Sequence, residues 1–224
     1  GEPSRINAHP HCDCAGNIAV VHNGVINNFE RLKQQLISEG HNLVSETDTE
    51  VIPHLIEKYY GGSLEKAVED ALRVVEGSYA IVVLMVGEPK LVVARKDSPL
   101  IIGIGDRENF TASDVPAILN YTNRVIYLED DDIGVITADD VKVTRQGAGV
   151  DRERHRISWS MEDARKGGYG HFMLKEIHDQ PEAVMDSFRG RVSFNPFNVE
   201  LNELPFSDDV IKNIDRVVFI GMGT

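Results

Sequence analysis

The sequence is poor in the features of secreted, membrane-spanning and nucleic-acid-binding proteins. Its two cysteines, Cys12 and Cys14, are too close together for an unstrained bridge, which favours the reducing cytoplasm. No apolar run approaches the length that spans a bilayer, and the first residues lack the basic and apolar regions of a signal peptide. The formal net charge of −13 argues against a non-specific nucleic-acid binder, because phosphates would repel it.

What the sequence does contain is typical of a globular protein. Hydrophobic residues make up 42% and charged residues 26% of its 224 residues, enough for one large domain or two small ones. The chain opens on Gly1-Glu2-Pro3-Ser4 without an initiator Met, and it stops at Gly221-Met222-Gly223-Thr224 directly after an apolar run. We therefore expect both ends to be cuts through a longer protein.

Helical periodicity occupies the first third of the chain. Apolar residues at helical spacing predict three helices, over residues 29–37, 51–56 and 64–75. Asn28 is the expected N-cap of the first helix and Gly40 the residue that ends it. Pro53 removes an N–H early in the second helix. Ser63 is the expected N-cap of the third helix, and Gly77 its stop.

Strands dominate from residue 79 onward. Tyr79–Val86 is a near-continuous apolar run, and further strands are expected over residues 91–94, 100–104, 109–112, 125–128 and 133–137. Strands in succession without long helices between them favour an antiparallel sheet in a layered α+β domain. Polar residues 145–170 are interpreted as a connector. Helices near 173–185 and 210–214 follow, and a strand over 216–220 leads into Gly221–Thr224, as at the start of a phosphate-binding loop.

The dipeptide Asn23-Gly24 has two interpretations. Asn-Gly between the apolar residues 18–22 and 25–26 is a tight-turn signal, and the dipeptide alone favours that hairpin turn. Alternatively, the side-chain amide of Asn23 and the backbone N–H of Gly24 can donate together to a developing oxyanion. Asp48 is similarly ambiguous: taken singly it favours a helix cap, but its carboxylate could hold the ammonium group of an amino-acid substrate.

Metal sites are not predicted. His and Cys are dense in His9-Pro10-His11-Cys12-Asp13-Cys14, but the spacing matches no standard zinc motif and a second pair of ligands is missing. The acidic run Glu129–Asp132 lacks the spacing of a calcium loop, and a solvated turn explains it better.

Taken together and in order, these segments resemble the type-2 glutamine amidotransferases, which are N-terminal-nucleophile hydrolases. The resemblance rests on HNGVINN at residues 22–28 and SETDTEV at residues 45–51. Further segments are similar to one branch, the glutamine–fructose-6-phosphate aminotransferase (glucosamine-6-phosphate synthase) family. These segments are residues 1–4, 7–11, 94–100, 112–114, 128–130 and 173–181. The Lys-Glu-Ile…Gln-Pro element at residues 175–181 is specific to this branch, and the resemblance spans essentially the whole chain.

The resemblance implies an architecture and an activity. It implies an α+β, N-terminal-nucleophile αββα sandwich over residues 1–150, incomplete at its N-terminus, then a linker over 151–170. Residues 171–224 would begin a doubly wound α/β sugar-isomerase domain. Such enzymes hydrolyse glutamine and pass ammonia through a channel to fructose 6-phosphate. The product is glucosamine 6-phosphate, in the first step of amino-sugar (UDP-N-acetylglucosamine) synthesis. The resemblance also implies no metal or organic cofactor, and a homodimer formed through the isomerase domain.

Carried over by position, Asn23 and Gly24 correspond to the oxyanion hole, and Gly24 also contacts the substrate. Asp48 corresponds to the residue that binds the α-amino group of glutamine. His9 lies at a histidine characteristic of the family and is carried over as a further substrate-binding residue.

The chain departs from the family at the nucleophile. In the family this is an N-terminal cysteine whose own α-amino group serves as base, whereas this chain starts at Gly1, and Cys12 and Cys14 do not align with it. The upstream segment whose arginine holds the glutamine carboxylate is missing too, so we expect the chain alone to lack glutaminase activity. Three alternatives stay open: a phosphoribosyl-pyrophosphate amidotransferase, a catalytically dead module that senses glutamine or sugar, and a fragment whose unpaired sheet edge prevents native folding.

Overall fold

The computed structural model describes residues 2–158, 169–188, 192–194, 197–199 and 207–218. The chain divides into two compact units, residues 1–164 and 165–224. None of the helices among the described residues is both long enough and apolar enough to cross a membrane.

Two antiparallel sheets form the frame of the first unit. The seven-stranded sheet has the order β1-β2-β3-β4-β8-β9-β10, and the four-stranded sheet the order β11-β7-β5-β6. The strands are β1 (His11–Cys12), β2 (Ile18–Ile26), β3 (Gly77–Met85), β4 (Leu91–Lys96), β5 (Ile101–Ile104), β6 (Asn109–Ala112), β7 (Arg124–Tyr127), β8 (Asp132–Ile136), β9 (Val141–Arg145), β10 (Ala148–Gly149) and β11 (Arg154–Arg156).

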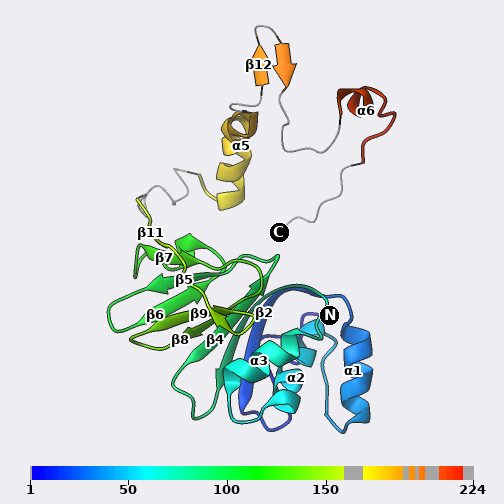
Figure 1. Cartoon of the computed structure of the whole chain (residues 1–224), viewed down its shortest axis with the longest axis vertical. Helices are drawn as coiled ribbons and strands as arrows, with labels where there is room; N and C mark the ends of the chain where they lie inside the picture. The colour runs from blue at the N-terminus through cyan, green and yellow to red at the C-terminus, as the bar shows by residue number, and fades with distance from the viewer. Residues whose placement is uncertain (1, 159–168, 189–191, 195–196, 200–206, 219–224) are drawn as a thin grey trace. The chain divides into compact units, whose positions relative to one another are not determined.

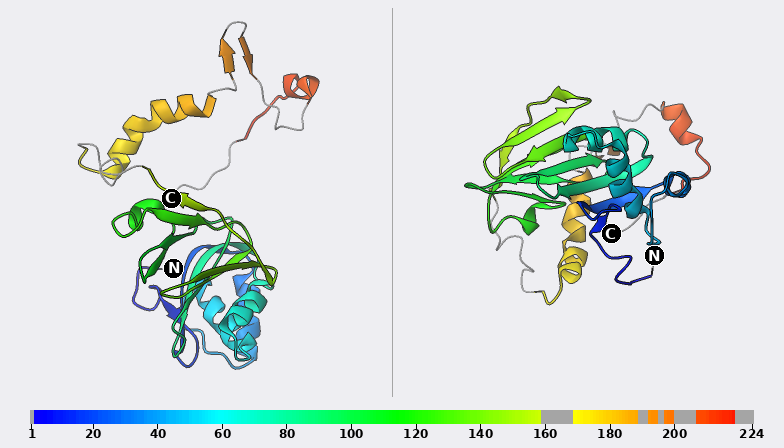
Figure 2. Two further views of the ribbon diagram at one scale, coloured as in Figure 1. Left: turned by 60° about the vertical axis from the view of Figure 1, so that its left-hand side comes forward. Right: turned by 90° about the horizontal axis from the view of Figure 1, so that it is seen from below.

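Helices cover one face of the seven-stranded sheet. They are α1 (Phe29–Ser38), the 3₁₀ turn η1 (Asp48–Glu50), α2 (Val51–Tyr59) and α3 (Leu64–Leu72), and they gather on the same side of β2 in Figures 1 and 2. Their apolar faces and one face of β2, β3 and β4 share a buried core, and a second core lies between the two sheets. The outer face of the four-stranded sheet is covered by the 3₁₀ turn η2 (Val115–Ala117) and the turns after it. The layers are therefore helix, sheet, sheet and a short 3₁₀ segment.

The three predicted helices are confirmed, and so are two of their expected ends. The side chain of Ser63 accepts from the backbone N–H of Lys66, which is an N-cap bond. Gly40 ends α1 in a left-handed conformation, with φ +97°. Its backbone N–H donates to the carbonyl of Ile37, and the backbone N–H of the next residue, His41, donates to the carbonyl of Leu36. These bonds form a Schellman motif, which fixes the position of His41 relative to α1.

Two details of the helix prediction are wrong. Asn28 precedes α1, but its side chain does not cap it. The amide instead donates to the carbonyl of Val74 and accepts from the N–H of Glu76, and so ties the start of α1 to the chain after α3. Gly77 does not stop α3, which ends at Leu72; it begins β3 with φ +130°.

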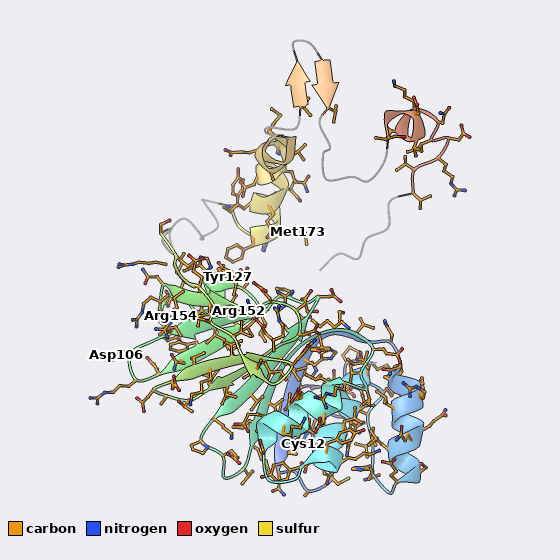
Figure 3. All side chains as sticks on the ribbon, in the orientation of Figure 1. Cys12, Asp106, Tyr127, Arg152, Arg154 and Met173 are labelled. Carbon is orange, nitrogen blue, oxygen red and sulfur yellow. The ribbon has the colours of Figure 1, made fainter. Side chains whose placement is uncertain are left out.

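The strands predicted between residues 79 and 137 are present, but β9, β10 and β11 lie where no strand was expected. β9 has five residues, of which only Val141 and Val143 are apolar, and β10 and β11 are shorter still. Arg152, labelled in Figure 3, fixes the segment between β10 and β11, because its guanidinium makes two 2.8 Å hydrogen bonds to the buried carboxylate of Asp132. The segment interpreted as a connector thus begins with ordered, paired chain, and the domain boundaries at 150 and 170 stay predictions.

The described residues of the second unit form a long helix and three short elements. They are α5 (Phe172–Phe188), β12 (Val192–Phe194), β13 (Phe197–Val199) and α6 (Asp208–Lys212). Of the predicted strand over 216–220, residues 216–218 have no regular secondary structure. The remaining residues, and the Gly221–Thr224 loop, lie outside the described part of the chain. The start of a sugar-isomerase domain stays a prediction.

Candidate functional site

Asn23 and Gly24 lie inside the continuous strand β2, so the turn predicted from the dipeptide is wrong. Asn23 pairs with Ala80 and Gly24 with Tyr79 of β3. Side chains alternate along β2: Val20 and His22 are buried towards the helices, and Asn23 is exposed on the opposite face. The Asn23 amide is therefore accessible to a ligand.

Gly24 is required by the close approach of β3. Its φ is +144°, and a Cβ placed on it would lie 2.2 Å from the carbonyl oxygen of Ser78. Gly77 has the same role on the facing strand, because its Cβ would lie 2.1 Å from the carbonyl oxygen of Val25. The two glycines let β2 and β3 approach here more closely than side chains would allow.

The edge of β2 beside these residues is largely open. β1 pairs only with Ala19 and Val20, so in the described part of the chain β3 is the one strand neighbour of residues 21–26. The N–H of Ile26 points to this open edge and donates to Oδ2 of Asp48 at 2.7 Å. Asp48 begins η1, but it bonds across to β2 rather than capping its own helix. Among the described residues, no hydrogen bond reaches its second oxygen, Oδ1.

A chain of three side chains connects His9 to the sheet. The hydroxyl of the buried Thr49 lies 3.2 Å from Nε2 of His9 and 3.0 Å from Nδ1 of His22. His22 Nε2 faces the carbonyl of Ser78, which can only accept, so this nitrogen carries the proton in neutral His22. Thr49 then donates to His22 and accepts from Nε2 of His9. Burial lowers the pKa of His22, which favours the neutral form that these hydrogen bonds require.

Glu50 holds the loop that carries Asp48. Its buried carboxylate accepts from the backbone N–H of Val44 at 2.9 Å, and from both the N–H and the hydroxyl of Ser45 at 2.7 Å. Burial alone would raise the pKa of Glu50, but these hydrogen bonds outweigh it and the pKa lies below its usual value. An ionised Glu50 thus fixes the loop against the start of α2.

All four predicted site residues line one cavity of about 590 Å³, a size typical of small-molecule sites. The sequence analysis did not single out its other lining residues, of which Thr49, Glu46 and Asn7 show the clearest structural roles. The amide of Asn7 exchanges hydrogen bonds with Glu46, at 3.0 and 3.3 Å, and closes one side. The cavity therefore combines the side-chain amide of Asn23 and the backbone N–H of Gly24 with the carboxylate of Asp48, which has one oxygen hydrogen-bonded.

The two cysteines lie elsewhere. Neither Cys12 nor Cys14 lines this cavity, and both side chains are exposed. Cys14 lies instead within hydrogen-bonding distance of His41 and His54, and its backbone N–H donates to Glu57. His11 bonds Thr47 through Nε2 at 3.0 Å, and so supports the loop before Asp48. Neither cysteine therefore lies where it could attack a ligand beside Asn23.

The fold and the cavity agree with the match to a protein family. A family model described as a glutamine amidotransferase domain matches residues 4–120, and the chain belongs to this family. It is 51% identical to the glutamine–fructose-6-phosphate aminotransferase (isomerizing) of Methanothermobacter thermautotrophicus. It is 48% identical to that of Pyrococcus horikoshii and 46% to that of Clostridium tetani. Each alignment covers the whole chain but 37% of the relative, so the chain spans little more than a third of their length.

Two solved structures share this fold. The glutamine phosphoribosylpyrophosphate amidotransferase of B. subtilis superposes with a TM-score of 0.55 at 26% identity, over 63% of this chain and 32% of that one. An allosteric regulatory enzyme of purine biosynthesis gives the same TM-score at 25% identity, over 73% of this chain and 39% of that one. The mixed α/β, two-sheet architecture is thus that of the N-terminal-nucleophile amidotransferases.

Proposed function

We propose that the cavity is the glutamine site of an amidotransferase that transfers ammonia to fructose 6-phosphate and releases glucosamine 6-phosphate and glutamate. The observation that carries this proposal is the convergence of Asn23, Gly24, Asp48 and His9 on one cavity. The relatives named as glutamine–fructose-6-phosphate aminotransferases support the choice of acceptor, because they match the chain over its whole length. A homodimer, formed through a sugar-isomerase domain, belongs to the same proposal.

The oxyanion is stabilised by Asn23 and Gly24 in this proposal. Attack of a thiol on the side-chain amide of glutamine turns the carbonyl oxygen into an oxyanion, which needs donors already in place. Asn23 offers its side-chain NH₂ on the exposed face of β2, and Gly24 offers its backbone N–H beside it, where the second edge of β2 has no strand neighbour in the described part of the chain. The attacking thiol comes from a cysteine outside residues 1–224, because neither cysteine of the chain lines the cavity.

The α-amino group of glutamine is held by Asp48. The bond from Ile26 fixes Oδ2 and leaves Oδ1 to accept from an ammonium group. The carboxylate of Glu50 keeps the loop in place through Val44 and Ser45. His9 borders the same cavity, and its ring is oriented by Thr49. The ammonium group of glutamine thus meets the carboxylate of Asp48, whose orientation is already fixed by the hydrogen bond to Oδ2.

The test uses the protein that carries this chain together with an N-terminal cysteine segment. Given glutamine and fructose 6-phosphate, it should produce glutamate and glucosamine 6-phosphate. Asn23→Ala should lower kcat about 10²–10³-fold, the usual loss when one oxyanion donor is removed. Asp48→Asn should mainly raise KM for glutamine. Asn27→Ala is the matched control: Asn27 borders the same cavity but has no assigned role, and this variant should stay near wild type.

Two results would contradict the proposal. Turnover with phosphoribosyl pyrophosphate and none with fructose 6-phosphate would favour the amidotransferase found among the similar solved structures. Glutamine binding without hydrolysis, in the presence of the N-terminal cysteine, would favour a sensing module. Equal loss of activity in Asn23→Ala and Asn27→Ala would remove the role given to Asn23.

A further inference from the structure

Four metal-binding side chains converge on the helical side of the seven-stranded sheet. They come from three segments: Cys14 from the turn after β1, His41 from the Schellman motif after α1, and His54 and Glu57 from α2. One ligand atom of each lies within 4.8 Å of all the others. The cluster is separate from the proposed glutamine cavity, whose lining contains none of the four residues.

Four of the six separations between these atoms are close to those of a tetrahedral zinc site. Zinc binds sulfur at about 2.3 Å and nitrogen or oxygen at about 2.0–2.1 Å, so tetrahedral angles place S and N about 3.6 Å apart and N and O about 3.3 Å apart. The Cys14 sulfur lies 3.5 Å from Nδ1 of His41 and 3.4 Å from Nδ1 of His54. Oε2 of Glu57 lies 3.0 and 3.5 Å from the same two nitrogens.

Hydrogen bonds alone account poorly for this arrangement. Each imidazole presents the same nitrogen, Nδ1, both to the thiol of Cys14 and to Oε2 of Glu57. A ring nitrogen of a neutral imidazole is either one donor or one acceptor, so it serves one of these neighbours and faces the other without a proton to share. A cation at the centre satisfies all four groups at once.

We propose that Cys14, His41, His54 and Glu57 bind one Zn²⁺ ion. Binding forms four bonds to the metal, and the thiol proton of Cys14 is released to solvent as the sulfur becomes a thiolate. A sulfur, two imidazoles and a carboxylate suit zinc, which accepts soft and hard ligands in a tetrahedron. The exposed Cys14 gives the ion a path from solvent, while His54 is only 1% exposed.

The site is structural rather than catalytic. Four protein ligands complete a tetrahedron and leave no open position for a substrate or water. The ion would tie α2 to the turn before β2 and to the end of α1. Since α2 follows directly on η1, which carries Asp48 and Thr49, the metal would hold the wall of the neighbouring cavity in register. The proposal departs from the sequence analysis, which predicted no metal site because the spacing of residues 9–14 matches no standard zinc motif and a second pair of ligands was judged missing.

The experiment measures zinc bound to the purified protein that carries this chain. The protein is stripped with a chelator, given zinc, dialysed and analysed for metal by mass spectrometry. The chain should retain one equivalent, and cobalt in its place should give a thiolate-to-cobalt charge-transfer band. Cys14→Ser should lose that band and weaken binding about 100-fold or more, beyond the effect usual for outer-sphere contacts. Cys12→Ser, whose residue is labelled in Figure 3, is the matched control and should retain both.

A second variant keeps the test decisive if Cys14→Ser does not fold. His41→Ala removes a ligand from the loop after α1 and should also abolish retention, with circular dichroism reporting the fold. Zinc should raise the thermal midpoint of wild type and Cys12→Ser but not of His41→Ala. The proposal is overturned if wild type retains no zinc, if folded His41→Ala or Cys14→Ser retains as much as wild type, or if Cys12→Ser loses it equally. None of these readouts depends on glutaminase activity.

Discussion

Replacing Gly24 with alanine is expected to separate β2 from β3 at the cavity. The new Cβ would lie 2.2 Å from the carbonyl oxygen of Ser78, 2.7 Å from its carbonyl carbon and 2.9 Å from Cα of Tyr79. All three atoms belong to the backbone, so no side-chain rotation relieves the overlap. The φ of +144° is also one that alanine rarely adopts.

The magnitude follows from these two effects. Forcing an extra methyl group into packed structure costs about 1–3 kcal/mol, and a strained backbone conformation costs about 1–3 kcal/mol more. The sum of about 2–6 kcal/mol is a large part of the ~5–15 kcal/mol by which a domain of this kind is stable. Gly24→Ala should therefore lower the free energy of unfolding severely.

The assay is urea unfolding followed by circular dichroism, with Gly40→Ala as the control. Gly40 also has a positive φ, +97°, but no atom lies within 4 Å of its added Cβ. Its substitution should cost only about 1–2 kcal/mol, the penalty of the left-handed conformation. If Gly24→Ala costs no more than Gly40→Ala, the close approach of the two strands does not constrain this position and the reasoning fails.

Two further predictions concern buried carboxylates. Glu50→Gln places an amide NH₂ against the donors of Ser45 and should cost about 2–4 kcal/mol. The folded-state pKa of Glu50 is lowered, so the ionised carboxylate stabilises the fold above the unfolded-state pKa, and this stabilisation is lost as the pH falls through the folded-state pKa. The free energy of unfolding, measured at decreasing pH, should therefore depend less on pH in Glu50→Gln than in wild type. Asp132→Asn should cost about 3–5 kcal/mol, because Asp132 is fully buried and its carboxylate pairs with both Arg145 and Arg152. Asp130→Asn, at an exposed pair, should cost less than about 1 kcal/mol by the same unfolding measurement, and equal losses at the two positions would contradict the role of burial.

Much of the fold could be predicted because neighbouring residues in the sequence determine where the helices form and end. The helices show apolar residues at helical spacing, and Ser63 and Gly40 occupy the positions that cap chemistry favours. The prediction failed where a distant strand decides the conformation. Asn23-Gly24 has the composition of a turn, yet nine consecutive residues of β2 pair with β3 through it. Gly77 was predicted to stop a helix because it follows one in the sequence. In the structure a glycine is needed there because a side chain would collide with the backbone of Val25.

The sequence predicted which residues form the candidate site, but not the hydrogen bonds that join them. Asn23, Gly24, Asp48 and His9 do line one cavity, although their individual roles are still predictions. The hydrogen bonds through Thr49 and Glu50 join residues whose relation only the folded chain reveals. The Cys14 cluster was missed because its ligands are spread over residues 14–57. The one local signal was the pair His54 and Glu57, three apart on one face of α2.

The open edge of β2 also bears on self-association. An unpaired strand edge is a template for another strand, and here it carries the exposed apolar side chains of Val21 and Val25. A second copy of the chain can extend the sheet at this edge by main-chain hydrogen bonds. An extended segment laid there within the same polypeptide would block that pairing and at the same time lie beside Asn23 and Gly24. Pairing of that segment with β2 would then both protect the edge from aggregation and complete the proposed glutamine cavity.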